Sequence, residues 1–438
     1  MVNWMYAVRR TACIVMMVLA CIFAAGLTVG AKTTLEFWHS WGTNEDFQAT
    51  LDRFEALYPD IEINAVPLAA SGRESKVLAA MISNTAPDVL MATRSEVIQF
   101  ADVQMIIPID NFVRDYGINL SRFYRAEIDG FKWDNQLWAL PMPTSGGNES
   151  LIFYNKDVFA ELGLNPEIAP KTWQDIEALA KRANRWEGGL LTRLGFDVAT
   201  FNRYNALLYS NNGNFLSPDG RSAAFGSPEG RYALEWMYRF TNEVNGGLTA
   251  IRTLTAGAIN DRFMEGKVAA VYAGVSVFPV FLSNEVNFGV GLIPYNADNP
   301  NAFHRGVAGR LYGWGYVMPT SIPASKIDAA FKFIKFLTTE PQGGCEFLKV
   351  SARPTPLRDC NADRSYFQRN PHWDVVGQAL ELDVPYPMTP VDASIQPLIN
   401  NMVTAVMNGQ QSPSAGIDNA VRQVQAILDA FWADKDSR

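Results

Sequence analysis

A short stretch in the first half of the chain combines residues that control the backbone with polar side chains able to bind a ligand. Pro141 and Pro143 restrict φ and remove backbone donors, and a Ser-Gly-Gly run then allows almost any backbone conformation. Asn148 and Glu149 come next, shortly before the β-favouring run Leu-Ile-Phe-Tyr. We interpret the stretch as a crossing between two lobes that places an amide and a carboxylate where they can hold a small molecule.

Residues suited to catalysis are few, and their spacing matches no catalytic motif. The chain has three histidines, His39, His304 and His372. Gly274-Val-Ser276 begins like a nucleophile elbow but lacks its final glycine. The sequence contains no Walker loop, Cys-x-x-Cys pair or His-Glu-x-x-His, so we expect no metal and no cofactor. An acidic chain offers many accidental carboxylate pairs, and a glycosidase therefore stays open as the second class of function.

Residues 1–31 have the layout of a secretory signal peptide. Two arginines precede an apolar run that ends in small residues. We predict cleavage after Ala31 and export to the periplasm. A transmembrane anchor is the competing interpretation, because the apolar run is nearly long enough to span a bilayer. The bulky Leu19 argues against lipid attachment at Cys21.

Composition indicates a large exported protein with an acidic surface. The exported part is long enough for two domains, and no second long apolar run follows. The full chain has a net charge of −8 at pH 7, and cleavage would remove two arginines and no acidic residue. This balance argues against nucleic acid or an anionic membrane as the main partner. Cys345 and Cys360 alone remain after cleavage, which predicts a disulfide, with two unrelated small side chains as the alternative.

The residues on both sides of the crossing alternate between strand and helix patterns. Strand patterns near 35–39, 61–65 and 87–91 are separated by helical patterns, which predicts a β-α-β-α-β order with parallel strands. The alternation resumes less regularly after the crossing, with strand patterns near 268–272 and 288–293. The expected fold class is α/β.

Eight short motifs along the exported chain carry a family resemblance. They are Leu35-Glu-Phe-Trp-His-Ser-Trp-Gly42, Phe54-Glu-Ala-Leu-Tyr-Pro59, Ala86-Pro-Asp-Val89, Phe153-Tyr-Asn-Lys-Asp157, Pro170-Lys-Thr-Trp173, Phe263-Met-Glu-Gly-Lys267, Ala329-Ala-Phe-Lys-Phe-Ile-Lys-Phe-Leu337 and Arg353-Pro-Thr355. In order and spacing they resemble the extracellular solute-binding proteins of ABC importers, specifically the maltose-binding type (family 1).

The resemblance implies two α/β lobes, each a mainly parallel sheet flanked by helices, with a ligand cleft between them that closes by a hinge motion. On this chain the first lobe would take residues 32–142 with 305–353, and the second 143–304 with 354–438. The crossings would fall near 141–143, 305–310 and 354–356.

The resemblance also implies that solute binds beyond the carboxyl ends of the strands. The residues expected there are Trp41, Arg73, Arg94, Asn148, Glu149, Gly274, Ser276, Tyr312, Gly313, Trp314 and Arg353. Sugars present C–H faces that stack on aromatic rings, and hydroxyls that need planar polar partners. The stacking candidates are therefore Trp41 and Trp314, with core packing as the alternative for each. The hydroxyl-binding candidates are Arg94, Asn148, Glu149 and Arg353.

The implied function is capture of a mono- or oligosaccharide or a polyol, and its delivery to the transmembrane subunits and ATPase of an ABC permease. The protein would be a periplasmic monomer and not an enzyme. Glycerol-phosphate binders of the same family also begin with Phe-Trp-His-Ser, so an anionic solute is the alternative, although Glu149 would repel it. A secreted carbohydrate-active enzyme, and a receptor that presents solute to a sensor protein, also stay open.

Overall fold

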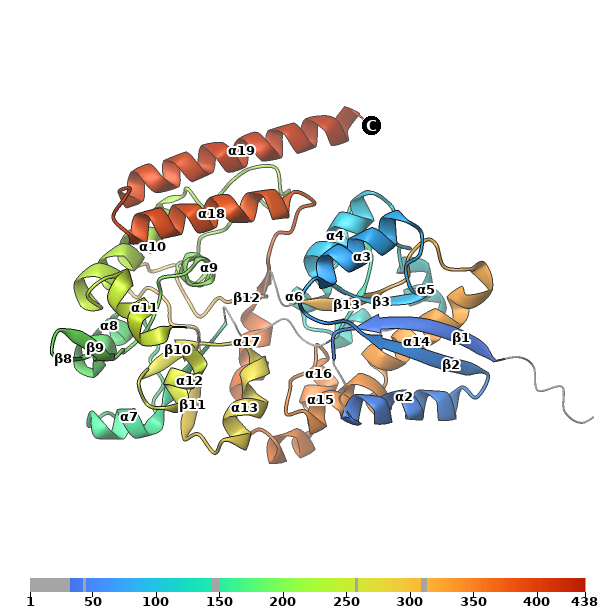
Figure 1. The fold of residues 1–438 in the computed structure, drawn as a ribbon, viewed down its shortest axis with the longest axis horizontal. Helices are drawn as coiled ribbons and strands as arrows, with labels where there is room; N and C mark the ends of the chain where they lie inside the picture. The colour runs from blue at the N-terminus through green and yellow to red at the C-terminus, as the bar shows by residue number, and fades with distance from the viewer. Residues whose placement is uncertain (1–31, 42–44, 143–149, 257–258, 309–312, 438) are drawn as a thin grey trace, which may run out of the picture.

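The computed structural model describes residues 32–41, 45–142, 150–256, 259–308 and 313–437. These residues form two lobes that lie side by side (Figure 1). Each lobe has a hydrophobic core of its own, and the chain passes between the cores more than once. The predicted two-lobed α/β fold is confirmed.

The first lobe is built on a five-stranded sheet in the order β2-β1-β3-β13-β6. Its strands are β1 (Thr33–His39), β2 (Ile61–Pro67), β3 (Val89–Thr93), β6 (Leu140–Pro141) and β13 (Trp314–Val317). Parallel pairing joins β1 to β2 and β3, as the alternating pattern predicted. The lobe's helices are α2 (Glu45–Leu57), α3 (Arg73–Ile82), α4 (Arg94–Asp102), α5 (Asp110–Asp115), α6 (Arg125–Asp129), α14 (Ile327–Thr339), α15 (Glu346–Val350) and α16 (Arg358–Asn361).

The second lobe has a three-stranded sheet with β7 (Leu151–Asn155) between β10 (Ala270–Tyr272) and β11 (Phe288–Leu292). Every residue of β7 is buried, since helices cover the sheet. Its helices include α7 (Lys156–Glu161), α8 (Trp173–Ala183), α9 (Phe201–Ser210), α10 (Pro228–Arg239), α11 (Leu248–Thr255), α12 (Ile259–Met264), α13 (Phe278–Ser283), α18 (Asp392–Met407) and α19 (Pro413–Ser437).

The expectation of a mainly parallel sheet is confirmed in the first lobe, where β13 runs against the other four strands, and needs a correction in the second. β13 pairs antiparallel with both neighbours in the first lobe, and β7 does so in the second, where both pairings of the sheet are therefore antiparallel. Each of these strands follows a passage of the chain from the other lobe. Trp314 begins β13 opposite Thr93, the last residue of β3, and Leu151 begins β7 opposite Leu292, the last residue of β11. A strand that enters at the carboxyl edge of its neighbours must run against them.

The connection between the lobes includes a short parallel pair, β12 (Val307–Ala308) with β14 (Val384–Pro385). Helix α17 (Trp373–Leu382) precedes β14, and its first residue packs in the first core while Val376 and Ala379 pack in the second. The first core also holds Leu357, Cys360 and Tyr366. This distribution favours a third crossing within α17, and the lobe boundaries and the crossing expected near 354–356 remain proposals.

A second contact between the lobes is made by the last turns of α19, which lies on the outside of the second lobe and extends toward α4 (Figure 1). Lys435 Nζ lies 2.8 Å from Asp102 Oδ1. The Trp133 ring lies 5.9 Å from the Trp432 ring and 6.3 Å from the Phe431 ring. Trp133 Nε1 also donates to Asp102 Oδ1 at 3.1 Å. We call these five residues the α19 contact.

The predicted disulfide between Cys345 and Cys360 is present, with Cα atoms 5.8 Å apart. It joins the residue before α15 to α16, and both cysteines are buried. The alternative of two unrelated side chains is therefore excluded.

Candidate ligand-binding site

The first wall of the candidate site follows directly from the end of β1. Ser40 and Trp41 come after the last residue of this strand, at the carboxyl edge of the parallel part of the sheet. The indole Nε1 of Trp41 donates to Tyr316 Oη at 3.0 Å, and the ring meets Phe347 edge-on at 4.8 Å. Both contacts fix the plane of an indole that is only partly buried.

Trp314 supplies a second indole at the same edge, because β13 begins there. The Arg73 guanidinium lies 4.9 Å from its ring centre. Arg73 is buried and donates to Glu96 Oε1 at 2.6 Å, to the Met91 carbonyl at 2.6 Å and to Ser40 Oγ at 3.1 Å. Arg73 is thus neutralised by a carboxylate and supports Trp314 from behind.

Glu96 is held in place by the start of α4. Thr93 caps this helix, and Glu96 accepts a hydrogen bond from the Thr93 backbone N–H at 2.8 Å in return. This reciprocal capping box orients the carboxylate that pairs with Arg73. The start of α4 therefore determines the position of Glu96, and through it the position of the Arg73 guanidinium beside Trp314.

Arg353 and Ser351 form the opposite wall, just beyond α15. The Arg353 guanidinium carbon lies 5.9 Å from the Trp41 ring centre. Arg353 Nε and Ser351 Oγ are both buried and have no hydrogen-bond partner among the described residues. Burial lowers the pKa of Arg353 from its ordinary value, and Arg353 forms no ion pair with a described carboxylate. A buried polar atom without a partner is costly, and a ligand oxygen would remove that cost.

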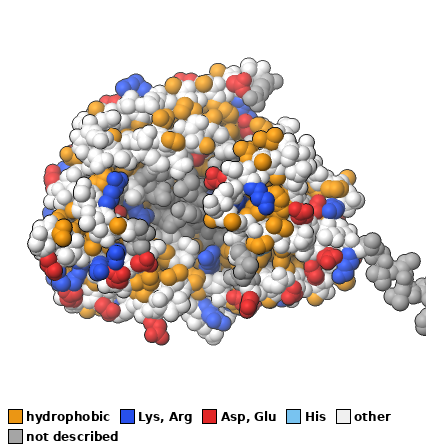
Figure 2. All heavy atoms as spheres, viewed as in Figure 1, with side chains coloured by type: hydrophobic (Ala, Val, Ile, Leu, Met, Phe, Trp, Pro, Cys, Tyr) orange, Lys and Arg blue, Asp and Glu red, His pale blue; other side chains and the backbone are white. Residues whose placement is uncertain are grey.

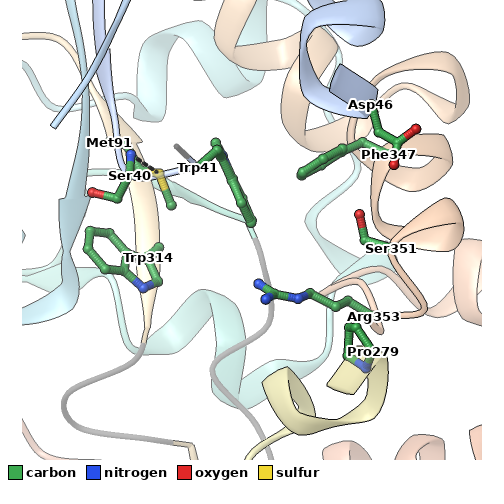
Figure 3. Close-up of a pocket in the computed structure, with 9 residues that line it drawn as sticks. All are labelled: Ser40, Trp41, Asp46, Met91, Pro279, Trp314, Phe347, Ser351 and Arg353. Atoms are coloured by element: carbon green, nitrogen blue, oxygen red, sulfur yellow. Dashed lines mark hydrogen bonds between the residues drawn. The ribbon is translucent and has the colours of Figure 1, made fainter. Parts of the chain in front are cut away.

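These walls enclose a cavity of about 340 Å³ (Figure 3). It is lined by Ser40, Trp41, Asp46, Met91, Pro279, Trp314, Phe347, Ser351 and Arg353. Pro279 belongs to α13 of the second lobe and the other residues to the first, so the cavity lies between the lobes. Figure 3 shows the two indoles on one side, with the Arg353 guanidinium reaching toward them from the other. Figure 2 shows that the molecule is hollowed between the lobes on the face in view.

The structure brings three of the predicted site residues together at the cavity, Trp41, Trp314 and Arg353, and places Arg73 directly behind them. Gly313 contributes its carbonyl, which accepts from the Arg94 backbone N–H at 2.8 Å. Asn148, Glu149 and Tyr312 lie outside the described residues.

Three other predicted residues do not line the cavity. Arg94 is fully buried, 3.7 Å from Glu127 and over the Phe131 ring, so its side chain serves the interior of the first lobe. Burial lowers its pKa, an effect that the Glu127 carboxylate opposes. Gly274 and Ser276 lie in the turn before α13, and only the later residue Pro279 reaches the cavity.

Sequence reasoning missed Asp46, Met91, Pro279, Phe347 and Ser351 as lining residues. Phe347 and Ser351 are four residues apart at the end of α15, a spacing that places two residues on the same face of a helix. This spacing, shortly before the predicted site residue Arg353, was the available signal. No comparable signal marked Pro279, because it comes from the other lobe.

No group of His, Cys, Asp and Glu among the described residues is arranged to hold a metal ion. None of the described helices has the length and apolar character needed to cross a membrane.

Comparison with known proteins identifies the family. Residues 40–344 match the family model described as bacterial extracellular solute-binding protein. The sn-glycerol-3-phosphate-binding periplasmic protein UgpB of Escherichia coli K12 is 23% identical over 426 residues, covering 92% of this chain and 94% of that protein.

Solved structures show the same fold. The ABC substrate-binding protein Lmo0181 of Listeria monocytogenes, in complex with cycloalternan, has a TM-score of 0.76 at 20% identity, covering 91% of this chain and 99% of that chain. The sugar-binding protein MalE of Xanthomonas citri also has a TM-score of 0.76 at 20% identity, covering 93% and 100%. The predicted fold and the predicted class, a solute-binding protein of a transporter, are confirmed. The chain belongs to the bacterial extracellular solute-binding proteins.

Proposed function

We propose that this protein captures a carbohydrate, either a mono- or oligosaccharide or a polyol, in the cavity between its lobes and delivers it to an ABC permease and its ATPase. The observation that carries the proposal is the chemistry of that cavity. The cavity is lined by two indoles, Trp41 and Trp314, and by Arg353 and Ser351, whose Nε and Oγ atoms have no partner among the described residues. Stacking surface opposite hydrogen-bond donors is the combination that a sugar ring needs.

The size of the cavity and the relatives agree with this solute class. About 340 Å³ lies at the lower end of the range of small-molecule sites, roughly 300–1,000 Å³. MalE of Xanthomonas citri and Lmo0181, which have the same fold, are a sugar-binding protein and a protein solved with cycloalternan.

An sn-glycerol-phosphate solute is the second candidate, and Arg353 is the observation that favours it. Its guanidinium lies at the cavity with no described carboxylate beside it, and guanidinium groups bind phosphate through two parallel hydrogen bonds. UgpB, which binds sn-glycerol 3-phosphate, is similar along most of the chain. Asp46 on the same cavity argues for a neutral solute, because its carboxylate would repel a phosphate.

The setting proposed for this function is export and action in the periplasm as a monomer that performs no catalysis. Residues 1–31 would be removed, so the exported protein should begin at Lys32. N-terminal sequencing of protein recovered from the periplasm checks this. An intact N-terminus in the membrane fraction would instead support the transmembrane anchor.

A thermal-shift panel tests the solute class. Purified protein is heated with mono- and oligosaccharides, polyols and sn-glycerol 3-phosphate, because a ligand at 100 times its Kd stabilises the folded state by about 2.7 kcal/mol. We expect one neutral carbohydrate to raise Tm. A rise with sn-glycerol 3-phosphate alone would establish the second candidate, and release of product from a glycoside would establish an enzyme.

A further inference from the structure

The two cavity-lining residues that have buried polar atoms without a described partner, Ser351 and Arg353, lie inside the loop closed by the disulfide. Cys345 is followed at once by α15, and Ser351 and Arg353 come directly after this helix. Cys360 closes the loop from α16. The covalent bond therefore holds one end of the segment that carries the cavity's polar wall.

The other end of the segment is held to the same helix by a buried amide. Asn361 Oδ1 accepts from the Thr355 backbone N–H at 2.9 Å, and Asn361 Nδ2 donates to the Thr355 carbonyl at 2.8 Å. Tyr366 Oη adds a hydrogen bond to the Cys345 carbonyl at 2.5 Å. The segment 345–355 is thus fixed at both ends. A disulfide joins Cys345 to Cys360, and hydrogen bonds join Thr355 to Asn361.

Between these ends the backbone adopts a conformation that needs such support. Ala352 has a φ of 52°, in the left-handed region that is unfavourable for an ordinary L-residue. This turn lets the Arg353 backbone N–H return to the Leu348 carbonyl at 2.8 Å. It also leaves the Arg353 side chain directed toward the Trp41 ring (Figure 3).

Helix α15 separates the disulfide side of this segment from the solute side. Phe347 and Ser351 line the cavity, while Glu346 and Lys349 line a surface hollow of about 440 Å³ together with both cysteines. A dithiol reductant can therefore approach the disulfide from a surface that does not include the cavity. Ser351 and Arg353 follow this short helix along the chain.

From these contacts we infer that Cys345 and Cys360 are positioning residues for the solute site. Their disulfide keeps the Ala352 turn, and with it Arg353 and Ser351, in the binding arrangement before solute arrives. The inference rests on the proposed function, since it assumes that Arg353 contacts solute. Loss of the bond should allow residues 346–355 to fluctuate, and solute binding would then have to supply the ordering free energy.

The test combines a measurement without ligand and a measurement of affinity on the Cys345→Ser/Cys360→Ser double variant. Hydrogen–deuterium exchange of peptides covering 346–355 should be at least 10-fold faster than in the oxidised protein, with little change in β1 or α8. Val77→Ala is the matched control, because it removes buried volume in α3 of the same lobe without touching α15. It should lower Tm and leave exchange of 346–355 unchanged. Equal exchange of this segment in the double variant and the oxidised protein would overturn the inference.

Affinity is measured by calorimetry with two probes, maltotriose and sn-glycerol 3-phosphate. For a probe that binds, the cysteine variant should weaken affinity about 10-fold in the native background and by less than 2-fold in an Arg353→Ala background. Reduction with dithiothreitol, which becomes a cyclic disulfide as two protein thiols form, should reproduce the loss, and reoxidation should restore affinity.

The affinity outcomes separate two kinds of failure. If Arg353→Ala itself leaves affinity unchanged, the proposed site is wrong. If Arg353→Ala weakens binding but the cysteine variant does not, the site stands and the positioning role is wrong. If neither probe binds, the exchange measurement decides the inference.

Discussion

Two of the places where the described parts of the lobes meet are built in opposite ways. At the cavity, side chains from both lobes leave about 340 Å³ of space, and polar atoms of Ser351 and Arg353 have no described partner. At the α19 contact the polar groups are paired: Lys435 with Asp102, and Trp133 Nε1 with the same carboxylate. Trp432 Nε1 donates in turn to the Gly220 carbonyl at 3.1 Å.

The cavity wall therefore has polar atoms that a ligand could pair, whereas the polar groups of the α19 contact are already paired within the protein. Unpaired polar atoms beside aromatic rings raise the free energy of the empty state, and a suitable ligand lowers it. Paired charges and packed rings have little left to gain from a ligand. The first region should therefore determine affinity, and the second should determine how the lobes are held.

The largest effect is expected from Arg353→Ala. Hydrogen bonds to charged groups are each worth about 1.5–3 kcal/mol, so solute affinity should fall roughly 10- to 150-fold with little change in Tm. Isothermal calorimetry with the solute found in the panel gives the measurement. Arg125→Ala is the control, because that side chain is 89% exposed and should leave affinity unchanged. A loss below 2-fold for Arg353→Ala would move the site away from this cavity.

A smaller loss is expected from Trp314→Ala. Removing the indole takes away a stacking surface and the ring over which Arg73 lies, which should weaken solute binding about 10-fold. Trp314→Phe retains a flat ring and should recover at least half of the lost free energy. Equal affinities for the alanine and phenylalanine variants would show that Trp314 packs the wall without contacting solute.

Trp133→Ala tests the other region of the comparison. Loss of the packing against Phe431 and Trp432 should lower Tm by about 2–5 °C while solute affinity stays within 3-fold. Trp186→Ala, on a partly exposed tryptophan outside the α19 contact, should lower Tm by less. An affinity change above 10-fold for Trp133→Ala would break the comparison, because the α19 contact would then share control of binding.

The smallest expected effect is a fall in Tm at acid pH. It depends on two histidines, His39 and His372, that support the cavity. Burial lowers the pKa of His39 to about 4, and burial with a minor effect of Lys156 does the same for His372. His39 Nδ1 accepts from the Trp41 backbone N–H at 3.2 Å, and the His372 ring stacks on Phe278, next to Pro279.

Because both pKa values are lower in the folded protein than the ordinary value near 6.5, the unfolded chain binds more protons as pH falls. Their stabilising contribution is complete above about pH 6.5 and is lost as pH falls through 4. Tm should therefore drop by a few degrees over this interval, and His372→Gln should reduce the drop. An identical pH profile for His372→Gln and the native protein would contradict the assignment.

The sequence alone supported the local parts of this structure because they depend on neighbouring residues. The strand–helix alternation predicted β1, β2 and β3 and their parallel order, and this is confirmed. Trp41, Trp314 and Arg353 were identifiable as residues that follow or begin strands or match a family motif, and all three line the cavity. Cysteine count and export predicted the Cys345–Cys360 bond, which is also confirmed.

What the sequence could not supply depends on residues that are distant along the chain. Arg94 directly follows strand β3, where a solute-binding residue was expected. Its side chain instead lies inside the first lobe, beside Glu127 and over the Phe131 ring. The reversed direction of β7 and β13 follows from where the chain returns between lobes, which no local pattern encodes.

The sequence by itself determined the class of protein, its alternating elements, its disulfide and the kinds of side chain available for a solute. The class of protein follows from the family motifs, the disulfide from the cysteine count, and the alternating elements from interactions within a few residues. Tertiary structure decided which of those side chains share one cavity, that Pro279 of the second lobe closes it, and that Arg353 lacks a described partner while Arg73 does not. The physical reason is that a cavity and an unpaired charge are properties of packing between segments far apart in the chain.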